Sequence, residues 1–308
     1  MALARWMLDA FAHIQIEKQW VEVEGHQMHC LKAGAGPELI LLHGLLGTAS
    51  TWELTIPSLA AESTIYAVDA LGIGESDRVP GMDPGLEAQA DRIVRFMDGA
   101  GVRSADFLAT SHGGAVALML AAKNPSRVRS LMLHAPANPF SRLAEPLIHF
   151  YLSGLGSWFA YRVPSLPGPM QALALGRMYG DPAQVRDGSL EKYISSLRVP
   201  GTIPYVLGML RTWFDDMGKL EAGLKHVRQF PALLLWGDRD RAVDLQSVQQ
   251  LRKSFDQAEL VVLPGTGHLP YEECPEIFAR TVNSFLERMR RQTEGGPRLV
   301  RPKAPAIS

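Results

Sequence analysis

The sequence predicts an α/β fold, with a mostly parallel, doubly wound sheet covered by helices on both faces. Short apolar runs recur along the chain, segments of helical periodicity separate them, and a proline-rich stretch interrupts this alternation once. Short runs that are apolar throughout are typical of parallel strands buried on both faces. The candidate strands are residues 39–42, 64–68, 106–109, 130–133, 233–236 and 260–263.

Before the parallel strands, the chain predicts a hairpin. Residues 20–24 and 28–32 alternate in polarity around a turn that contains Gly25, so they are expected to form the antiparallel first strands. Residues 1–19 precede the core, and Met1 to His13 predict an amphipathic helix. We expect this helix to pack on the protein, with a weak membrane-surface or dimer contact as the alternative.

Helices are predicted between the strands by apolar stripes at helical spacing. One such segment, Ala115 to Ala122, is apolar all round and should be buried. The three stripes are Leu86, Ala90, Ile93 and Met97, then Val248, Leu251 and Phe255, and finally Phe278, Val282, Phe285 and Met289 after Pro275.

Composition excludes several classes of protein. The 308 residues include 31 Lys and Arg against 32 Asp and Glu, a net charge of −1, so nothing favours nucleic acid as a partner. The two cysteines fit no metal spacing, and no run of 18 apolar residues could cross a bilayer. Because the first residues lack the features of a secretory signal, a cytoplasmic location is expected.

Ser111 lies at the junction of a predicted strand and a predicted helix. The string Ala109-Thr-Ser111-His-Gly113 matches the nucleophile elbow G-x-S-x-G, with alanine in the first small position. The turn is tight, so residues two positions either side of the serine must be small. Its hydroxyl would stand at a helix N-terminus, where negative charge is favoured.

Candidate partners follow the serine in a set order. Gly237-Asp238-Arg-Asp240 follows one apolar strand, and Gly267-His268 follows the last. With His43-Gly44 upstream, this serine, acid, histidine order resembles the α/β-hydrolase superfamily over roughly residues 20–290. The sequence is similar to a serine esterase or lipase with a helical cap.

The resemblance implies a triad with Ser111 as nucleophile, His268 as base and Asp240 as acid. The glycine spacing favours Asp240 over its neighbours, since Asp238 is expected at the surface or in the turn and Asp244 at a helix N-terminus. The backbone N–H groups of Leu45 and His112 would then form the oxyanion hole. No metal and no cofactor are required by such a site.

The resemblance also implies that residues 136–229 are a cap inserted between two core segments, residues 20–135 and 230–290. Nine of the 21 prolines fall there, which predicts short helices joined by turns. Some of its large apolar side chains should face Ser111, although the sequence does not say which: Phe150, Tyr151, Trp158, Phe159, Met170, Met178, Tyr179, Met209, Trp213, Phe214 and Met217. Residues 291–308 are predicted to be a disordered tail.

The predicted function is hydrolysis of small carboxylic esters with apolar acyl groups through an acyl-enzyme on Ser111. Carbon–carbon bond hydrolases, lactonases and perhydrolases use the same triad and remain alternatives. Carbon–carbon bond hydrolases of this fold usually place tryptophan after the histidine, whereas this chain has Leu269. A non-catalytic member that only binds a small ligand is a further alternative, which an intact Ser111, Asp240 and His268 set disfavours.

Overall fold

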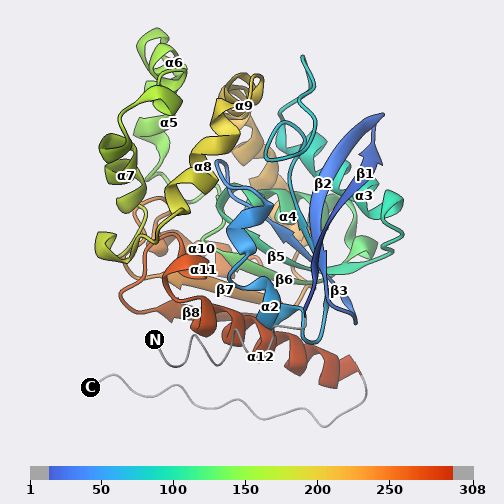
Figure 1. The fold of residues 1–308 in the computed structure, drawn as a ribbon. Helices are drawn as coiled ribbons and strands as arrows, with labels where there is room; N and C mark the ends of the chain where they lie inside the picture. Colours follow the sequence, from blue (N-terminus) through green and yellow to red (C-terminus); the bar gives the residue numbers. More distant parts are fainter. Residues whose placement is uncertain (1–13, 294–308) are drawn as a thin grey trace, which may run out of the picture.

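A single eight-stranded sheet forms the centre of the protein (Figure 1). In the computed structural model, residues 14–293 are described. The strand order is β1-β2-β4-β3-β5-β6-β7-β8; β1, β2 and β4 pair antiparallel in turn, and the other pairs are parallel. The strands are β1 (Ile16–Val23), β2 (His26–Ala33), β3 (Glu38–Leu42), β4 (Thr64–Val68), β5 (Ala105–Thr110), β6 (Val128–His134), β7 (Ala232–Gly237) and β8 (Ala258–Leu263).

The predicted hairpin is present, with a tighter turn and longer strands than the sequence indicated. β1 and β2 are joined by Glu24 and Gly25 alone, and both have positive φ angles, 56° and 78°. A two-residue turn with both residues in this region matches the right-handed twist of the strands it connects. β1 begins at Ile16, so the sheet reaches into the segment assigned to residues 1–19.

Helices cover both faces of the sheet, as the apolar stripes predicted. On one face lie α3 and α4, with α10 beside them, and on the other lie α2 and α12. Their bounds are α2 (Ile56–Leu59), α3 (Leu86–Gly99), α4 (Ser111–Lys123), α10 (Val248–Arg252) and α12 (Pro275–Thr293), while the short α11 (Pro270–Glu273) precedes α12.

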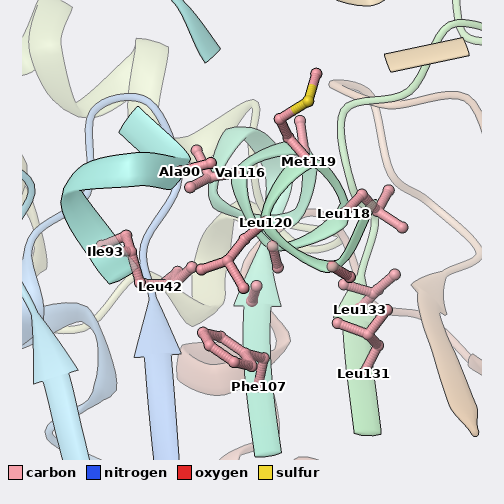
Figure 2. Packing of buried hydrophobic residues seen from close by; sticks show 14 of the residues in the cluster. Leu42, Ala90, Ile93, Phe107, Val116, Leu118, Met119, Leu120, Leu131 and Leu133 are labelled. Carbon is pink, nitrogen blue, oxygen red and sulfur yellow. The ribbon is translucent and has the colours of Figure 1, made fainter. Parts of the chain in front are cut away.

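Helix α4 is the buried centre of one layer, as its unbroken apolar sequence predicted. Ten consecutive residues from His112 to Ala121 are buried. Figure 2 shows Leu120 directed toward Phe107 and Leu42 on the sheet, while Leu118 lies beside Leu133 of β6. This packing fixes the N-terminus of α4 above the end of β5.

Helix α12 corrects the predicted start of the tail. The helix continues through Arg291 to Thr293, where the sequence had been interpreted as disordered from residue 291. Arg291 pairs with Glu287 one turn earlier, at 3.6 Å, which supports the last turn. The helix predicted over Met1 to His13, and residues 294–308, lie outside the described residues.

Five helices are inserted between β6 and β7, where the sequence predicted a cap. They are α5 (Glu145–Leu152), α6 (Gly154–Ala160), α7 (Gly168–Gly176), α8 (Ser189–Arg198) and α9 (Thr202–Gly223). Figure 1 shows α5, α6 and α7 projecting away from the sheet, while α9 returns toward α4. The boundaries at 136 and 229 stay a prediction. In the part of the chain described, no helix is long and apolar enough to cross a membrane.

Candidate active site

Ser111 occupies a strained turn between β5 and α4. Its φ angle is +53°, a region that residues with a Cβ rarely adopt. A Cβ on Gly113 would collide with the carbonyl oxygen of His43, and one on Gly44 would lie 3.1 Å from Ser111 Cβ. The glycine that follows the serine by two positions, Gly113, is therefore required by backbone that approaches from β3.

Asp240 and His268 are brought together from the ends of two strands. His268 Nδ1 lies 2.7 Å from Asp240 Oδ2, and both side chains are buried. The other carboxylate oxygen, Oδ1, accepts the backbone N–H groups of Ala242 at 2.7 Å and Val243 at 3.0 Å. Burial alone would raise the pKa of Asp240, but His268 and these hydrogen bonds lower it below its usual value. The carboxylate is thus held ionised against the imidazole.

The predicted base lies beside an uncharged histidine at the end of β6. The ring centroids of His134 and His268 are 5.6 Å apart, and His134 Nδ1 lies 2.8 Å from Thr110 Oγ1, next to the predicted nucleophile. Burial, and then the nearby His268, lower the pKa of His134 to about 3. Among the described residues, Ser111 Oγ and His268 are not hydrogen-bonded, so their direct partnership stays a prediction. Such contacts are often long before a substrate binds.

The loop after β3 is held in position for an oxyanion hole. His43 Nδ1 donates to Gly44 O at 2.7 Å, and His43 Nε2 accepts the N–H of Ala70 at 3.2 Å. The turn closes with Gly47 N–H donating to Gly44 O at 3.0 Å. Within residues 14–293, the N–H groups of Leu45 and His112 donate to no protein atom, which leaves both predicted donors free.

The side chain of His112 faces the cap. Its Nε2 lies 3.1 Å from Gln89 Oε1, and its ring stacks on Trp213 of α9, with centroids 6.0 Å apart. Burial, with a smaller effect from His43, lowers the pKa of His112 to about 4. The imidazole is therefore neutral at physiological pH, and it connects α4 to the inserted helices.

The two other acids near Asp240 have structural roles. Asp238 Oδ1 accepts the N–H of Gly265 at 2.7 Å, which supports the turn before His268. Asp244 accepts the N–H of Gln246 at 2.9 Å as the N-cap of a short 3₁₀ helix, the position that the sequence predicted. Among the described residues, the side chain paired with His268 is that of Asp240 and not that of either neighbour.

Comparison with known proteins decides the family. The family model described as alpha/beta hydrolase fold matches residues 37–275. The chain belongs to this family.

Its relatives include different kinds of protein. It is 31% identical to a dihydrolipoyllysine-residue acetyltransferase component of an acetoin cleaving system from Pseudomonas putida, over 88% of this chain and 69% of that protein. It is 29% identical to a 2-hydroxymuconate semialdehyde hydrolase from Pseudomonas sp. strain CF600, over 82% of this chain and 88% of that protein. It is 27% identical to a pimeloyl-[acyl-carrier protein] methyl ester esterase from Nitrosomonas europaea, over 82% of this chain and 96% of that protein.

In this hydrolase, an acid that the sequence analysis missed holds the histidine loop. Glu273 accepts the N–H groups of Gly267 at 2.9 Å and Leu269 at 3.3 Å, on either side of His268, and that of Gly180 in the insertion at 2.8 Å. Burial raises the pKa of Glu273, although these hydrogen bonds oppose the rise. One carboxylate thus fixes the backbone around His268.

A second missed acid anchors the insertion to the same loop. The buried Glu272 accepts the hydroxyl groups of Tyr179 at 2.6 Å, Tyr193 at 2.6 Å and Ser189 at 2.7 Å. His268 N–H also donates to Met178 O at 2.7 Å. Two adjacent acids in the first turn after Pro270 were the available sequence signal, but their partners in the insertion lie about 80 to 90 residues away.

The insertion places an apolar surface over the predicted oxyanion loop. Leu45 packs against two clusters of buried cap side chains, one containing Tyr205 and Met209 and the other Leu207 and Leu210. In the described residues, no group of three or more His, Cys, Asp or Glu side chains is arranged to hold a metal ion.

Proposed function

We propose that the protein hydrolyses carboxylic esters with apolar acyl groups through an acyl-enzyme on Ser111. The observation that carries the proposal is the buried Asp240–His268 pair, which lies at the same edge of the sheet as the strained Ser111 turn. Strained backbone of this kind is typical of functional positions, and a carboxylate on Nδ1 leaves Nε2 of the imidazole to accept a proton.

The chemistry assigns one role to each group. Ser111 Oγ attacks the ester carbonyl carbon while its proton passes to His268 Nε2, and the N–H groups of Leu45 and His112 bind the oxygen that becomes negative. The alkoxide leaves with the proton from His268. A water molecule, deprotonated by His268, then attacks the acyl carbon and releases the acid and Ser111. Asp240 stabilises the imidazolium in both steps.

The apolar acyl group is supported by the side chains around Leu45. Residues of α9 such as Tyr205 and Met209 pack against Leu45, which carries one of the two predicted donors. Apolar walls favour longer acyl chains by about 0.8 kcal/mol per methylene until the site is full. We therefore expect kcat/KM to rise about fourfold per methylene from acetyl esters and to stop rising once the acyl chain fills the site.

Carbon–carbon bond hydrolysis is the second candidate, because one relative is a 2-hydroxymuconate semialdehyde hydrolase. The buried Leu269 next to His268 argues against it, since such hydrolases usually have tryptophan there. Direct assay separates the two. Turnover of 2-hydroxymuconate semialdehyde far above that of every simple ester would replace the ester proposal.

An electrophilic phosphonate ester tests the nucleophile. The activated serine should attack phosphorus, because the tetrahedral adduct places an oxygen where the oxyanion would lie. Intact-protein mass should rise by one adduct, and peptide mapping should locate it on Ser111. Ser111→Ala and His268→Ala should suppress labelling, whereas Asp238→Asn, which keeps the acceptor for Gly265, should not. A folded wild-type protein that stays unlabelled would refute the hydrolase proposal.

A further inference from the structure

The three outer helices of the cap expose apolar side chains to solvent. Each of α5, α6 and α7 carries a pair that lies three positions apart, so both members are on one face of the helix. The pairs, together called the outer cap surface, are Leu147 and Phe150, Leu155 and Trp158, and Met170 and Leu173. Leu173 and Leu155 are the most exposed of the six, at 72% and 69%. Single exposed apolar side chains are common, but a group of them marks a surface that contacts a partner or a membrane.

Each of these helices also has a buried side that attaches it to the protein. Ile148 of α5 packs against Leu207 of α9. A Cβ on Gly156 of α6 would collide with the carbonyl oxygen of Phe150, so α6 lies directly on α5. Leu175 of α7 is buried in the core cluster on the α12 side of the sheet. The outer cap surface is therefore not what holds the helices in place, and Figure 1 shows α5 and α6 projecting at the opposite end of the molecule from α12.

Positively charged side chains border the outer cap surface. Residues 142–177 contain three arginines and one glutamate, whereas the whole chain has a net charge of −1. Arg142 precedes α5, Arg162 follows α6 and Arg177 follows α7. Within residues 14–293, Arg162 and Arg177 form no ion pair, and Arg142, whose side chain is 85% exposed, lies 3.9 Å from Glu145. Most of the positive charge around the apolar pairs is thus not neutralised, which makes this surface complementary to negative charge.

Trp158 and Arg162 combine both properties at one point. The guanidinium carbon of Arg162 lies 5.1 Å from the centroid of the Trp158 ring, and both side chains are exposed. An indole has a large apolar body and one N–H donor, and an arginine can lay its apolar stem on it while the charged end stays in water. Tyr161, also exposed, adds a third side chain with an apolar body and a polar end. Side chains of this kind suit the level of the headgroups in a bilayer.

Two occupants suit exposed apolar side chains, a second copy of this chain or a lipid surface. In a two-fold dimer the same patch of both copies is in contact, so the arginines of one copy would meet those of the other with few acids between them. A bilayer that contains anionic phospholipids supplies both what the apolar pairs lack and what the arginines lack. Each arginine near such a surface strengthens binding about fivefold.

We propose that the outer cap surface, with Arg142, Arg162 and Arg177 around it, docks on bilayers that contain anionic phospholipids. The apolar pairs of α5, α6 and α7 enter the boundary between headgroups and acyl chains, and the arginines lie among the phosphates. Such docking needs no helix that crosses the bilayer. It does not depend on ester hydrolysis either, so Ser111→Ala should bind vesicles as tightly as the wild type does.

Cosedimentation of the full-length protein with lipid vesicles tests the docking. Vesicles of phosphatidylcholine with about 30% phosphatidylglycerol are compared with vesicles of phosphatidylcholine alone at about 0.1 M salt. The protein should bind the mixed vesicles at least about tenfold more tightly, and added salt should weaken this binding. Absence of binding to the mixed vesicles, or equal binding to both kinds, would overturn the proposal.

Variants locate the contact, and their side chains are exposed, so the fold should tolerate them. Trp158→Ser and Leu173→Ser should each weaken binding to the mixed vesicles about tenfold, because each removes apolar area from the contact. The control Ile277→Ser changes an equally exposed side chain on α12 and should bind as the wild type does. Binding that both cap variants retain, or that Ile277→Ser weakens as much, would contradict the assignment.

A second pair of variants tests the charge. Arg177→Gln should weaken binding to the mixed vesicles about fivefold and leave binding to phosphatidylcholine unchanged. Arg280→Gln, which removes an exposed arginine from α12, should have no effect on either. If Trp6→Ser abolishes binding while Trp158→Ser and Leu173→Ser retain it, the first residues of the chain make the contact and the proposal is wrong.

Sedimentation velocity without lipid tests the other occupant. The wild type and Leu173→Ser should sediment alike at every protein concentration, because the outer cap surface is expected to be free until a bilayer is present. A dimer of the wild type that both Trp158→Ser and Leu173→Ser dissociate would assign this surface to a second copy of the chain and overturn the proposal.

Discussion

Replacing Asp240 by asparagine should reverse the polarity of one hydrogen bond while leaving the shape of the site intact. Asp240 Oδ1 already accepts from the backbone N–H groups of Ala242 and Val243, so the amide oxygen of the introduced asparagine must take that position. The amide nitrogen then occupies the place of Oδ2, 2.7 Å from His268 Nδ1. Both groups would be donors, unless the imidazole moves its proton to Nε2.

The proton on Nε2 is the source of the expected loss. In that tautomer, His268 cannot accept the proton of Ser111, and an equivalent change in a Ser-His-Asp protease lowers kcat about 10⁴-fold. We expect Asp240→Asn to lower kcat by about 10³- to 10⁴-fold, with a much smaller change in KM. Steady-state kinetics on a short-chain ester, with circular dichroism to confirm folding, measures it.

Two neighbouring substitutions are the controls. Asp238→Asn keeps an amide oxygen for the N–H of Gly265, and Asp244→Asn keeps a good N-cap, so each should retain activity within about threefold. If Asp238→Asn loses as much activity as Asp240→Asn, or if Asp240→Asn stays within about tenfold of wild type, the assignment of the acid is wrong.

Three further substitutions probe the surroundings of the site. Glu273→Gln should misplace His268 and lower kcat about 10- to 100-fold with little change in KM. Glu273→Asp should restore part of the activity. If KM rises as much as kcat falls, the positioning role of Glu273 is wrong. Gly44→Ala adds a Cβ 3.1 Å from the Cβ of Ser111 and should lower kcat about 100-fold. The control Gly218→Ala, whose Cβ would have no atom within 4 Å, should be neutral. If Gly44→Ala retains activity, the loop can move enough to accept a Cβ and the close approach is not required. Stability in urea should fall as the pH falls from about 6.5 toward 4, because the unfolded chain binds protons before the buried His112 and His134, whose pKa values are lowered to about 4 and about 3; at pH 5 each histidine costs about 2 kcal/mol. His112→Gln should remove the share of His112 alone, and a pH-independent wild type would refute the reasoning.

The strands and the acid–histidine pair could be predicted because each depends on local sequence and chain order. Apolar runs determine which segments are strands, and the carboxyl ends of parallel strands meet at one edge, which brings Asp240 to His268. The elbow could be predicted for the same reason, since its small residues and the helix after it are contiguous.

Residues that depend on the inserted helices were not predictable in this way. Arg92 and Gln89 fall outside the apolar stripe of α3 and would be assigned to a solvent-facing side, yet both are buried because α9 packs against α3. Glu272 and Glu273 likewise accept hydrogen bonds from hydroxyl and amide groups in a segment that is far away in sequence, so their roles were not visible locally. The sequence alone does not show how α9 packs against α3, so these contacts could not be predicted.

The bonds that join the histidine loop to the insertion limit how this enzyme can evolve or be engineered. Met178 O, Gly180 N–H and the hydroxyl of Tyr179 all bind the segment that contains His268 and α11. A lid transplanted from a relative would bring its own substrate walls but would lose these partners. Exchange of specificity by recombination should therefore succeed only when residues 178–180 and 268–273 are inherited as one unit.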